Sequence, residues 1–594
     1  MGFSYNKAIS LRPHKSRGFS TFLFVFLIAL AAISPYAVMN KEFFAVAAER
    51  GYQQLGTFLL TPADLRGYFF PIFGSLGMVI GAPIALFFRL IPSVALPYAA
   101  AGAMALRVAL CSLTAYFFIR RFTRTPEAAR LGAMLYSLGS AVAVITVNNA
   151  YNNMLILFPL MLLAAEKLMT ENRRMWLSVS VIATVLLSGY AAWSALIFLI
   201  GYCVIRMSSR DIKASVSRGA CVFFEIIIGA ATSAILLVPA FLAALTSTEL
   251  GDFVGVKALF AEPEYILGAM RAFLIPAESA NSPLLSAFTG GAYLPLLSLS
   301  GVIAYCGAKK YSAFKRIIIG SIVALAFPLI SSLFSLGNPA EGEMWLFMPS
   351  LIFAVATAIA LENREIKFAA GIKWSVALTV IFGAVMLAFP RLDGKNIAFG
   401  FYGAATGAGA IRLAIYLGVA LLGLILTAIL FKAADGRDKT LFNALTLGAA
   451  IFGGASLWLY IATEVRYFEK SLFYTFTDTN TALLSLDGVQ ADKAIYYSML
   501  VSVAAFGALL VYLIICISTR KKRREAECNY PEGEALMEMW TALDEEFSEA
   551  PVEEAEEFTL DTIAEQLGAE YPVNVDSAEF KGGFNIVMPE EIKK

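Results

Sequence analysis

The residue best placed for chemistry in this sequence is Asp64, the only carboxylate within residues 61–71. This segment follows the first long apolar run of the chain, so we expect it to place an ionisable group on the outer face of a membrane. The alternative is structural, because residues 62–64 could begin a short helix with Asp64 as its N-cap.

Arg107 is the second notable residue, because it lies near the middle of the apolar run 95–119. A charge at the centre of a membrane span costs on the order of 3 kcal/mol on insertion scales, so such a side chain usually faces a polar interior. Its partner could be Asp64. The alternative is an internal ion pair or a set of hydrogen bonds that only fixes helix packing.

The elements that must position these residues are membrane helices. Of the 594 residues, 59% are hydrophobic, and the mean hydropathy of +0.70 leaves too little polar surface to cover a soluble globule. Crossing a hydrocarbon core of about 30 Å takes roughly 20 helical residues. The sequence predicts an all-α, polytopic helical bundle of about fourteen transmembrane helices. The predicted spans are 19–40, 95–119, 131–148, 153–169, 175–190, 192–206, 221–245, 290–308, 316–336, 344–361, 370–390, 412–431, 441–463 and 495–518.

The lysines and arginines predict the orientation of these spans, because cytoplasmic loops collect positive charge. With the N-terminus inside, every predicted inner loop receives a basic cluster, so we expect both termini to be cytoplasmic. The clusters fall within residues 7–17, 120–130, 167–174, 206–218, 309–316, 364–373, 432–439 and 520–524. A cleaved signal peptide is the alternative for the first run, but that run continues to Met39 and its removal would spoil the charge pattern.

The cysteines and the single histidine argue against several kinds of site. The six cysteines lie in predicted spans, at their inner ends or in the tail, so no external pair is available and we expect no disulfides. The single histidine, His14, argues against a serine–histidine triad and against histidine-ligated zinc. No nucleic-acid-binding signature is present.

Several segments, in order along the chain, resemble the YfhO family of bacterial membrane proteins, which belongs to the broader GT-C class of glycosyltransferases. The resemblance covers roughly residues 10–365. It is carried by the acidic residue and aromatic run of residues 64–73, by the basic residue within residues 106–117, and by residues 151–160 and 166–168. Residues 188–190 and 288–293 are weaker matches. One departure is Asn153, where many relatives carry an acid.

This resemblance implies an enzyme of the bacterial cytoplasmic membrane that transfers a sugar from an undecaprenyl(polyprenyl)-phosphate donor to a cell-envelope polymer or glycolipid. It implies that Asp64 is the general base. The planar fork of arginine suits the donor phosphate. The expected phosphate-binding residues are Arg66, Arg89, Arg107 and Arg271. The expected sugar- or acceptor-binding residues are Tyr68, Tyr151, Asn152, Asn153, Glu262 and Glu264.

Each of these roles has a structural alternative. Arg66 could be only a local charge neighbour of Asp64, the aromatic residues could be ordinary interfacial anchors, and the asparagines could satisfy turn backbone. The acids of the outer segment 246–289 could complete the site or bind a divalent cation, although no spacing favours a metal. Acids spread over that distance more often form a solvated loop.

The predicted organisation has four parts. A basic cytoplasmic N-terminus (1–18) precedes a GT-C-like transmembrane module (19–365) with a large outer loop at 41–94. Further transmembrane helices (366–518) precede a basic anchor and an acidic, disordered cytoplasmic tail (519–594) that could also dock a partner. Two functional alternatives to the transferase are a lipid-linked-sugar transporter or flippase, and a non-catalytic scaffold that recruits partners through its tail.

Overall fold

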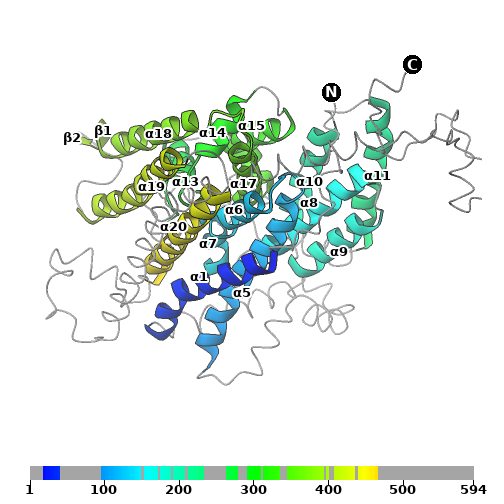
Figure 1. Cartoon of the computed structure of the whole chain (residues 1–594), viewed down its shortest axis with the longest axis horizontal. Coiled ribbons are helices and arrows are strands. Elements are labelled where there is room, and N and C mark those ends of the chain that lie inside the picture. Colours follow the sequence, from blue (N-terminus) through cyan, green and yellow to red (C-terminus); the bar gives the residue numbers. More distant parts are fainter. Residues whose placement is uncertain are drawn as a thin grey trace, which may run out of the picture. The chain divides into compact units, whose positions relative to one another are not determined.

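Helices make up nearly all of the described part of this computed structural model, and a short β-hairpin is the exception (Figure 1). The structure describes residues 18–39, 95–148, 153–171, 174–188, 192–207, 212–232, 263–277, 290–308, 312–334, 344–388, 390–393, 396–399, 407–434 and 439–465. Asp64 and the rest of the predicted outer loop 41–94, the last predicted span and the acidic tail lie outside these residues.

The first helices of the chain pack against its last described helix. α1 lies along α5, as Figure 1 shows, and it also contacts α20. It buries Val25, Ala29 and Ile33, which are spaced four residues apart, and it exposes Phe19 and Leu23. This is the pattern of a helix with one face toward protein and the other toward lipid. The bounds are α1 (Gly18–Met39), α5 (Leu96–Ile119), α6 (Pro126–Ser137), α7 (Ser140–Asn148) and α20 (Lys439–Val465).

Four further helices follow with short connections. α8 packs on α5 and α9, and α9 packs on α11. α8 and α9 are therefore neighbours both in sequence and in space, whereas α7 and α8 make few contacts. The bounds are α8 (Met154–Glu171), α9 (Trp176–Ser188), α10 (Ala192–Met207) and α11 (Ile212–Thr232).

The second half of the chain surrounds α17, which contacts α6, α14 and α15 and is almost completely buried. α14 approaches α17 and α18 closely, because Gly301 faces the Thr357 side chain and Gly371 faces the Ser300 carbonyl. The helices are α13 (Pro263–Leu274), α14 (Ser300–Gly307), α15 (Ser312–Ala326), α16 (Pro328–Phe334), η6 (Met344–Leu346), α17 (Phe347–Glu362), α18 (Phe368–Ala388) and α19 (Gly407–Ala433). The antiparallel hairpin is β1 (Pro390–Asp393) and β2 (Asn396–Phe399).

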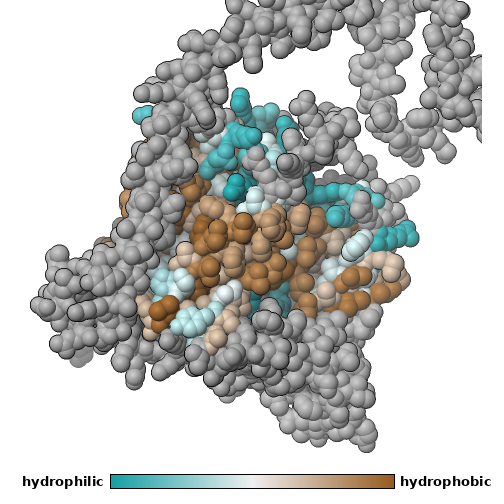
Figure 2. Space-filling model, turned by 60° about the horizontal axis from the view of Figure 1, so that its bottom comes forward, coloured by the Kyte–Doolittle hydropathy of each residue, from teal (hydrophilic) through white to brown (hydrophobic). Residues whose placement is uncertain are grey.

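Six described helices are long and apolar enough to cross a membrane, or eight if each of two bent helix pairs is one span. All six coincide with predicted spans. They are Gly18–Met39, Pro97–Ile119, Met344–Glu362, Phe368–Ala388, Ile411–Ala433 and Lys439–Thr463. Figure 2 shows hydrophobic residues in a broad band across one face, with hydrophilic residues along its border. The described structure is therefore that of a helical membrane protein.

Three predicted spans are not continuous helices in the structure. The span 131–148 is α6 and α7, bent by 45° at Leu138 and Gly139. The span 316–336 is α15 and α16, bent by 107° at Pro328, whose ring and missing N–H interrupt a helix. The span 290–308 is helical only in α14. Apolar length does not reveal such breaks.

Residues 290–299, the first half of the predicted span 290–308, are not helical. Pro295 cannot donate a helical hydrogen bond, and Leu296 and Ser298 have positive φ angles of 66° and 47°. The predicted span 221–245 also differs from the structure. It begins nine residues earlier, as α11, because the charges of residues 212–220 do not stop a helix.

The sharp bend at Pro328 is held by tryptophans. Trp345 Nε1 donates to Ser331 Oγ at 2.9 Å, and the Trp345 ring stacks on Phe334 with centroids 4.4 Å apart. Trp193 Nε1, on α10, donates to the carbonyl oxygen of Leu333 at 3.0 Å. α16 is thus fixed against both η6 and α10.

Candidate functional site

Three of the predicted site residues have described side chains: Arg107, Asn153 and Arg271. Glu264 lies on α13, where only its backbone is described. The remaining predicted site residues fall outside the described residues, and their grouping stays a prediction. They are Asp64, Arg66, Tyr68, Arg89, Tyr151, Asn152 and Glu262.

Arg271 is more buried than Arg107, the other predicted phosphate-binding arginine with a described side chain. It lies in the last turn of α13 and is only 1% exposed. α13 has twelve residues, which is too short to cross a membrane, and its C-terminal half is fixed by Ala272, by Leu274 and by a 5.6 Å ring contact between Phe273 and Phe353 of α17. The expectation of a solvated loop is therefore wrong for this part of segment 246–289.

The end of α13 is tied to the non-helical segment 290–299 and to the start of α7. Ala292 N donates to the carbonyl oxygen of Ala272 at 2.7 Å, next to Arg271. Ser140 N donates to the carbonyl oxygen of Tyr293 at 3.0 Å, and Ala277 N donates to Ser140 Oγ at 3.0 Å. We call this meeting of the α6–α7 bend, the α13 end and residues 290–299 the α13 junction.

Close backbone packing makes the α13 junction rigid. A Cβ atom at Gly291 would lie 2.7 Å from the Ala277 Cβ and 3.0 Å from the Ser140 Cβ, so only glycine fits there without movement. Thr427 Oγ1 of α19 donates to the carbonyl oxygen of Leu296 at 3.3 Å. In a membrane bundle, non-helical backbone is tolerated where it is buried in protein or lines a polar cavity.

The α13 junction also carries hydroxyl groups. The Ser137 hydroxyl, three residues before Ser140, is buried and has no hydrogen-bond partner among the described residues. Ser298 Oγ donates to the carbonyl oxygen of Phe273 at 3.3 Å. A buried cation on α13 and hydroxyl groups at the α13 junction are residue types that could hold a phosphate and orient a polar ligand.

Arg107 lies on a different helix. It is half-buried at the middle of α5, as expected for an intramembrane arginine. However, α5 packs mainly on α1, α6 and α8, and it makes no extensive contact with α13 in the described part of the chain. The structure therefore does not bring Arg107 and Arg271 onto directly packed helices.

Asn153 has a structural contact. Its Nδ2 donates to the carbonyl oxygen of Leu187 at 2.5 Å and so joins the start of α8 to the end of α9. This contact agrees with the alternative in which the asparagines satisfy backbone groups.

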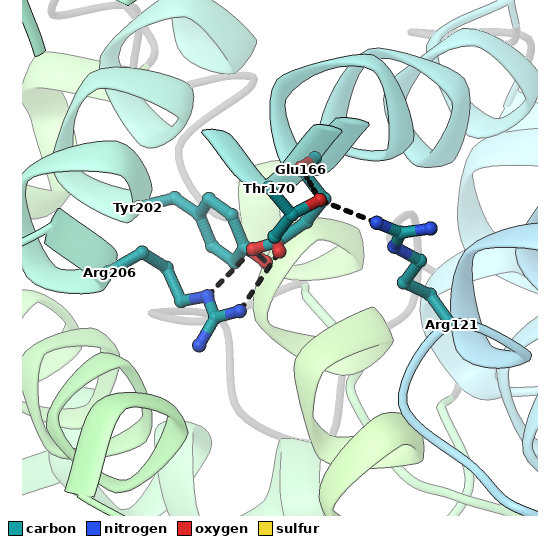
Figure 3. A network of polar contacts seen from close by, with 5 residues as sticks. All are labelled: Arg121, Glu166, Thr170, Tyr202 and Arg206. Atoms are coloured by element: carbon teal, nitrogen blue, oxygen red, sulfur yellow. Dashed lines mark hydrogen bonds and ion pairs between the residues drawn. The ribbon is translucent and has the colours of Figure 1, made fainter. Parts of the chain in front are cut away.

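A second polar cluster, shown in Figure 3, was not expected from the sequence. Glu166 of α8 is 1% exposed and accepts hydrogen bonds from Tyr202 Oη at 2.6 Å and from Arg206 Nε at 2.6 Å and Nη2 at 2.9 Å. The Arg206 guanidinium lies over the rings of Phe122 and Phe314, 5.6 and 5.4 Å from their centroids. We call Glu166, Tyr202 and Arg206 the Glu166 cluster.

The Glu166 cluster continues toward α5. Thr170 Oγ1 donates to the carbonyl oxygen of Glu166 at 2.6 Å and accepts a hydrogen bond from Arg121 Nη2 at 2.5 Å, while Arg121 also pairs with Glu171. In the sequence, the spacing of Tyr202 and Arg206, four residues apart on one helical face, could have indicated a shared polar contact. The paired charges indicate a structural clamp on the predicted cytoplasmic side.

No group of three or more histidine, cysteine, aspartate or glutamate side chains in the described residues could hold a metal ion. Glu262, one of the acids considered for a divalent cation, lies outside those residues.

Comparison with known proteins gives one result. No curated protein and no solved structure is significantly similar to the chain. A family model described as bacterial membrane protein YfhO matches residues 71–496, which is more than half of the 594 residues. The match begins after Asp64 and extends further toward the C-terminus than the resemblance noted in the sequence. The chain therefore belongs to the YfhO family of bacterial membrane proteins.

Proposed function

We propose that this protein is a membrane glycosyltransferase that moves a sugar from an undecaprenyl(polyprenyl)-phosphate donor to an envelope polymer or glycolipid on the outer face of the bacterial cytoplasmic membrane. The observation that carries the proposal is the burial of Arg271 on α13, within a segment that the charge pattern assigns to the outer side. The proposal includes fourteen spans with both termini in the cytoplasm.

The buried guanidinium suits the leaving group of this reaction. When the bond between the sugar's anomeric carbon and the phosphate oxygen breaks, negative charge develops on the departing polyprenyl phosphate. A cation fixed in a water-poor site stabilises developing charge more strongly than the same cation in water. Arg271 fills this role in the proposal, with Arg66, Arg89 and Arg107 as further phosphate ligands.

The proposed step balances without a redox partner. The acceptor hydroxyl oxygen forms a bond to the anomeric carbon, its proton passes to the Asp64 carboxylate, and the phosphate leaves with the electron pair of the broken bond. Tyr68, Tyr151, Asn152, Asn153, Glu262 and Glu264 are the proposed sugar and acceptor contacts. The rigid α13 junction supports the proposal because transfer requires reacting groups held in a fixed geometry.

The test is transfer of radiolabelled sugar from synthetic polyprenyl-phosphate donors to envelope acceptors, using membranes with equal amounts of each variant. We expect Arg271→Gln and Asp64→Asn each to lose at least 90% of transfer. The matched control is Arg174→Gln, which removes an exposed arginine from a predicted cytoplasmic loop and should leave transfer unchanged. Wild-type transfer that persists in both site variants would overturn the proposed roles.

A lipid-linked-sugar flippase is the second candidate, because the α6–α7 bend and the non-helical residues 290–299 are features that transporters use at their binding sites. The two candidates differ in their dependence on Asp64. A flippase should move a fluorescent lipid-linked sugar across proteoliposomes, should tolerate Asp64→Asn and should depend on Arg107.

A further inference from the structure

Five cations gather at one end of α5 and α15. Residues 120–124, which follow α5, contribute three arginines, and the first turn of α15 contributes Lys315 and Arg316. The two segments are joined by Phe122 and Phe314, whose rings meet edge to face with centroids 4.9 Å apart. We call Arg120, Arg121, Arg124, Lys315 and Arg316 the α15 basic patch.

Three acids near this patch, among the described residues, are engaged in other contacts. Glu362 accepts hydrogen bonds from the backbone N–H groups of Arg124 at 2.8 Å and Thr125 at 2.5 Å, and so caps the start of α6. Glu171 pairs with Arg121, and Glu166 is enclosed by the Glu166 cluster. The side chains of Arg124 and Arg316 are exposed at the surface of this patch.

An apolar stripe runs along α15 from the patch toward the membrane interior. Arg316, Ile319 and Val323 lie on one face of the helix, at i, i+3 and i+7, and Phe327 continues that face one turn later. Ile319 is 49% exposed, Val323 43% and Phe327 40%. Such a face contacts lipid chains, and the position of Arg316 at its end matches the level of a lipid headgroup.

We infer that the α15 basic patch binds the phosphate headgroup of an anionic glycerophospholipid, with an acyl chain along Ile319, Val323 and Phe327. The continuity of the cations with an exposed apolar stripe favours a lipid over a soluble phosphate or an acidic peptide. The charge pattern assigns this end of α15 to the cytoplasmic leaflet, where anionic headgroups attract basic residues. The inference does not depend on the proposed transferase activity.

The experiment is native mass spectrometry of the full-length protein in detergent, titrated with phosphatidylglycerol or phosphatidylcholine. We expect phosphatidylglycerol to bind more tightly. The double substitution Arg124→Gln and Arg316→Gln should weaken that binding about fivefold for each charge, or roughly 25-fold together. The matched control, Arg174→Gln with Lys432→Gln, removes two exposed cations from other predicted cytoplasmic loops and should stay within about twofold of wild type.

Two further measurements test whether a soluble anion or the acidic tail binds to the α15 basic patch instead of a lipid. Millimolar inorganic phosphate should not displace the lipid, and removal of the acidic residues 525–594 should not change its affinity. Displacement by phosphate would identify a soluble-anion site, and a large gain in affinity on removing the tail would identify the tail as the occupant. Either result overturns the inference, as does wild-type affinity in the Arg124 and Arg316 double variant. Each variant's thermal midpoint, compared with wild type, identifies loss of binding that is caused by unfolding.

Discussion

Arg206 holds both carboxylate oxygens of Glu166, with its Nε 2.6 Å from Oε1 and its Nη2 2.9 Å from Oε2. The two residues come from α10 and α8, and the Tyr202 hydroxyl adds a third hydrogen bond to the same carboxylate. Because Glu166 is almost fully buried, the pair fixes the relative position of two helices that are separated by α9 in the sequence.

Glu166→Gln should destabilise the protein by about 3 kcal/mol, because it leaves the Arg206 guanidinium without its anionic partner in a largely buried site. Thermal unfolding in detergent, followed by circular dichroism, measures the effect as a lowered midpoint. Glu365→Gln is the control, because it makes the same substitution at an exposed position and should shift the midpoint little. Equal midpoints for both variants would remove the clamp role from Glu166.

A pair of glycine substitutions on α14 tests the close approach of α14 to α17. Gly301→Ala places a Cβ atom against the Thr357 side chain and should cost about 1–3 kcal/mol through overpacking. Gly307→Ala places the same atom in open space and should be neutral or stabilising by up to about 1 kcal/mol. The thermal midpoint should therefore fall for Gly301→Ala and stay unchanged or rise for Gly307→Ala, and equal losses in both variants would contradict the packing of α14 against α17.

The sequence predicted the long elements of this fold and missed its interruptions. Apolar length was sufficient for α1, α5 and α17 to α20, because lipid requires about 20 apolar residues whatever surrounds the helix. Residues 290–299 are equally apolar, yet Pro295 and the hydrogen bonds from Ser140 and Thr427 hold them out of a helix. Those bonds join residues more than 100 positions apart, which a local pattern does not reveal.

The site was predictable only in part for a similar reason. The sequence singled out Arg271 as a phosphate ligand through family resemblance, but its burial depends on how α13 packs against α17 and α18. The partners in the Glu166 cluster are about 40 residues apart, so their pairing required the packing of α8 against α10. The residue types showed which positions carry polar side chains, whereas only the tertiary packing showed which of these side chains contact one another.

Alanine substitutions of Ser140 and Ser137 distinguish a residue that stabilises the α13 junction from a residue that contacts a ligand there. Ser140→Ala removes the acceptor of the Ala277 N–H and should cost about 1–3 kcal/mol, with transfer lost in proportion to folded protein. Ser137→Ala removes a buried hydroxyl that has no partner among the described residues, so stability should change little. Unfolding midpoints and sugar transfer should be measured for both variants. Loss of transfer in Ser137→Ala at an unchanged midpoint would indicate that this hydroxyl contacts a ligand.

Arg271→Lys tests whether the buried guanidinium acts through its paired N–H donors or only through its charge. Lysine keeps the positive charge but offers a compact ammonium in place of a planar group with paired N–H donors. If Arg271 holds the donor phosphate through paired hydrogen bonds, losing one charged hydrogen bond of about 1.5–3 kcal/mol should lower kcat/KM for transfer about 10- to 100-fold. Arg271→Gln should lose more, because it also removes the charge. Equal activity of Arg271→Lys and wild type would assign Arg271 a purely electrostatic role, and equal activity of all three proteins, at equal abundance in the membrane, would exclude it from phosphate binding.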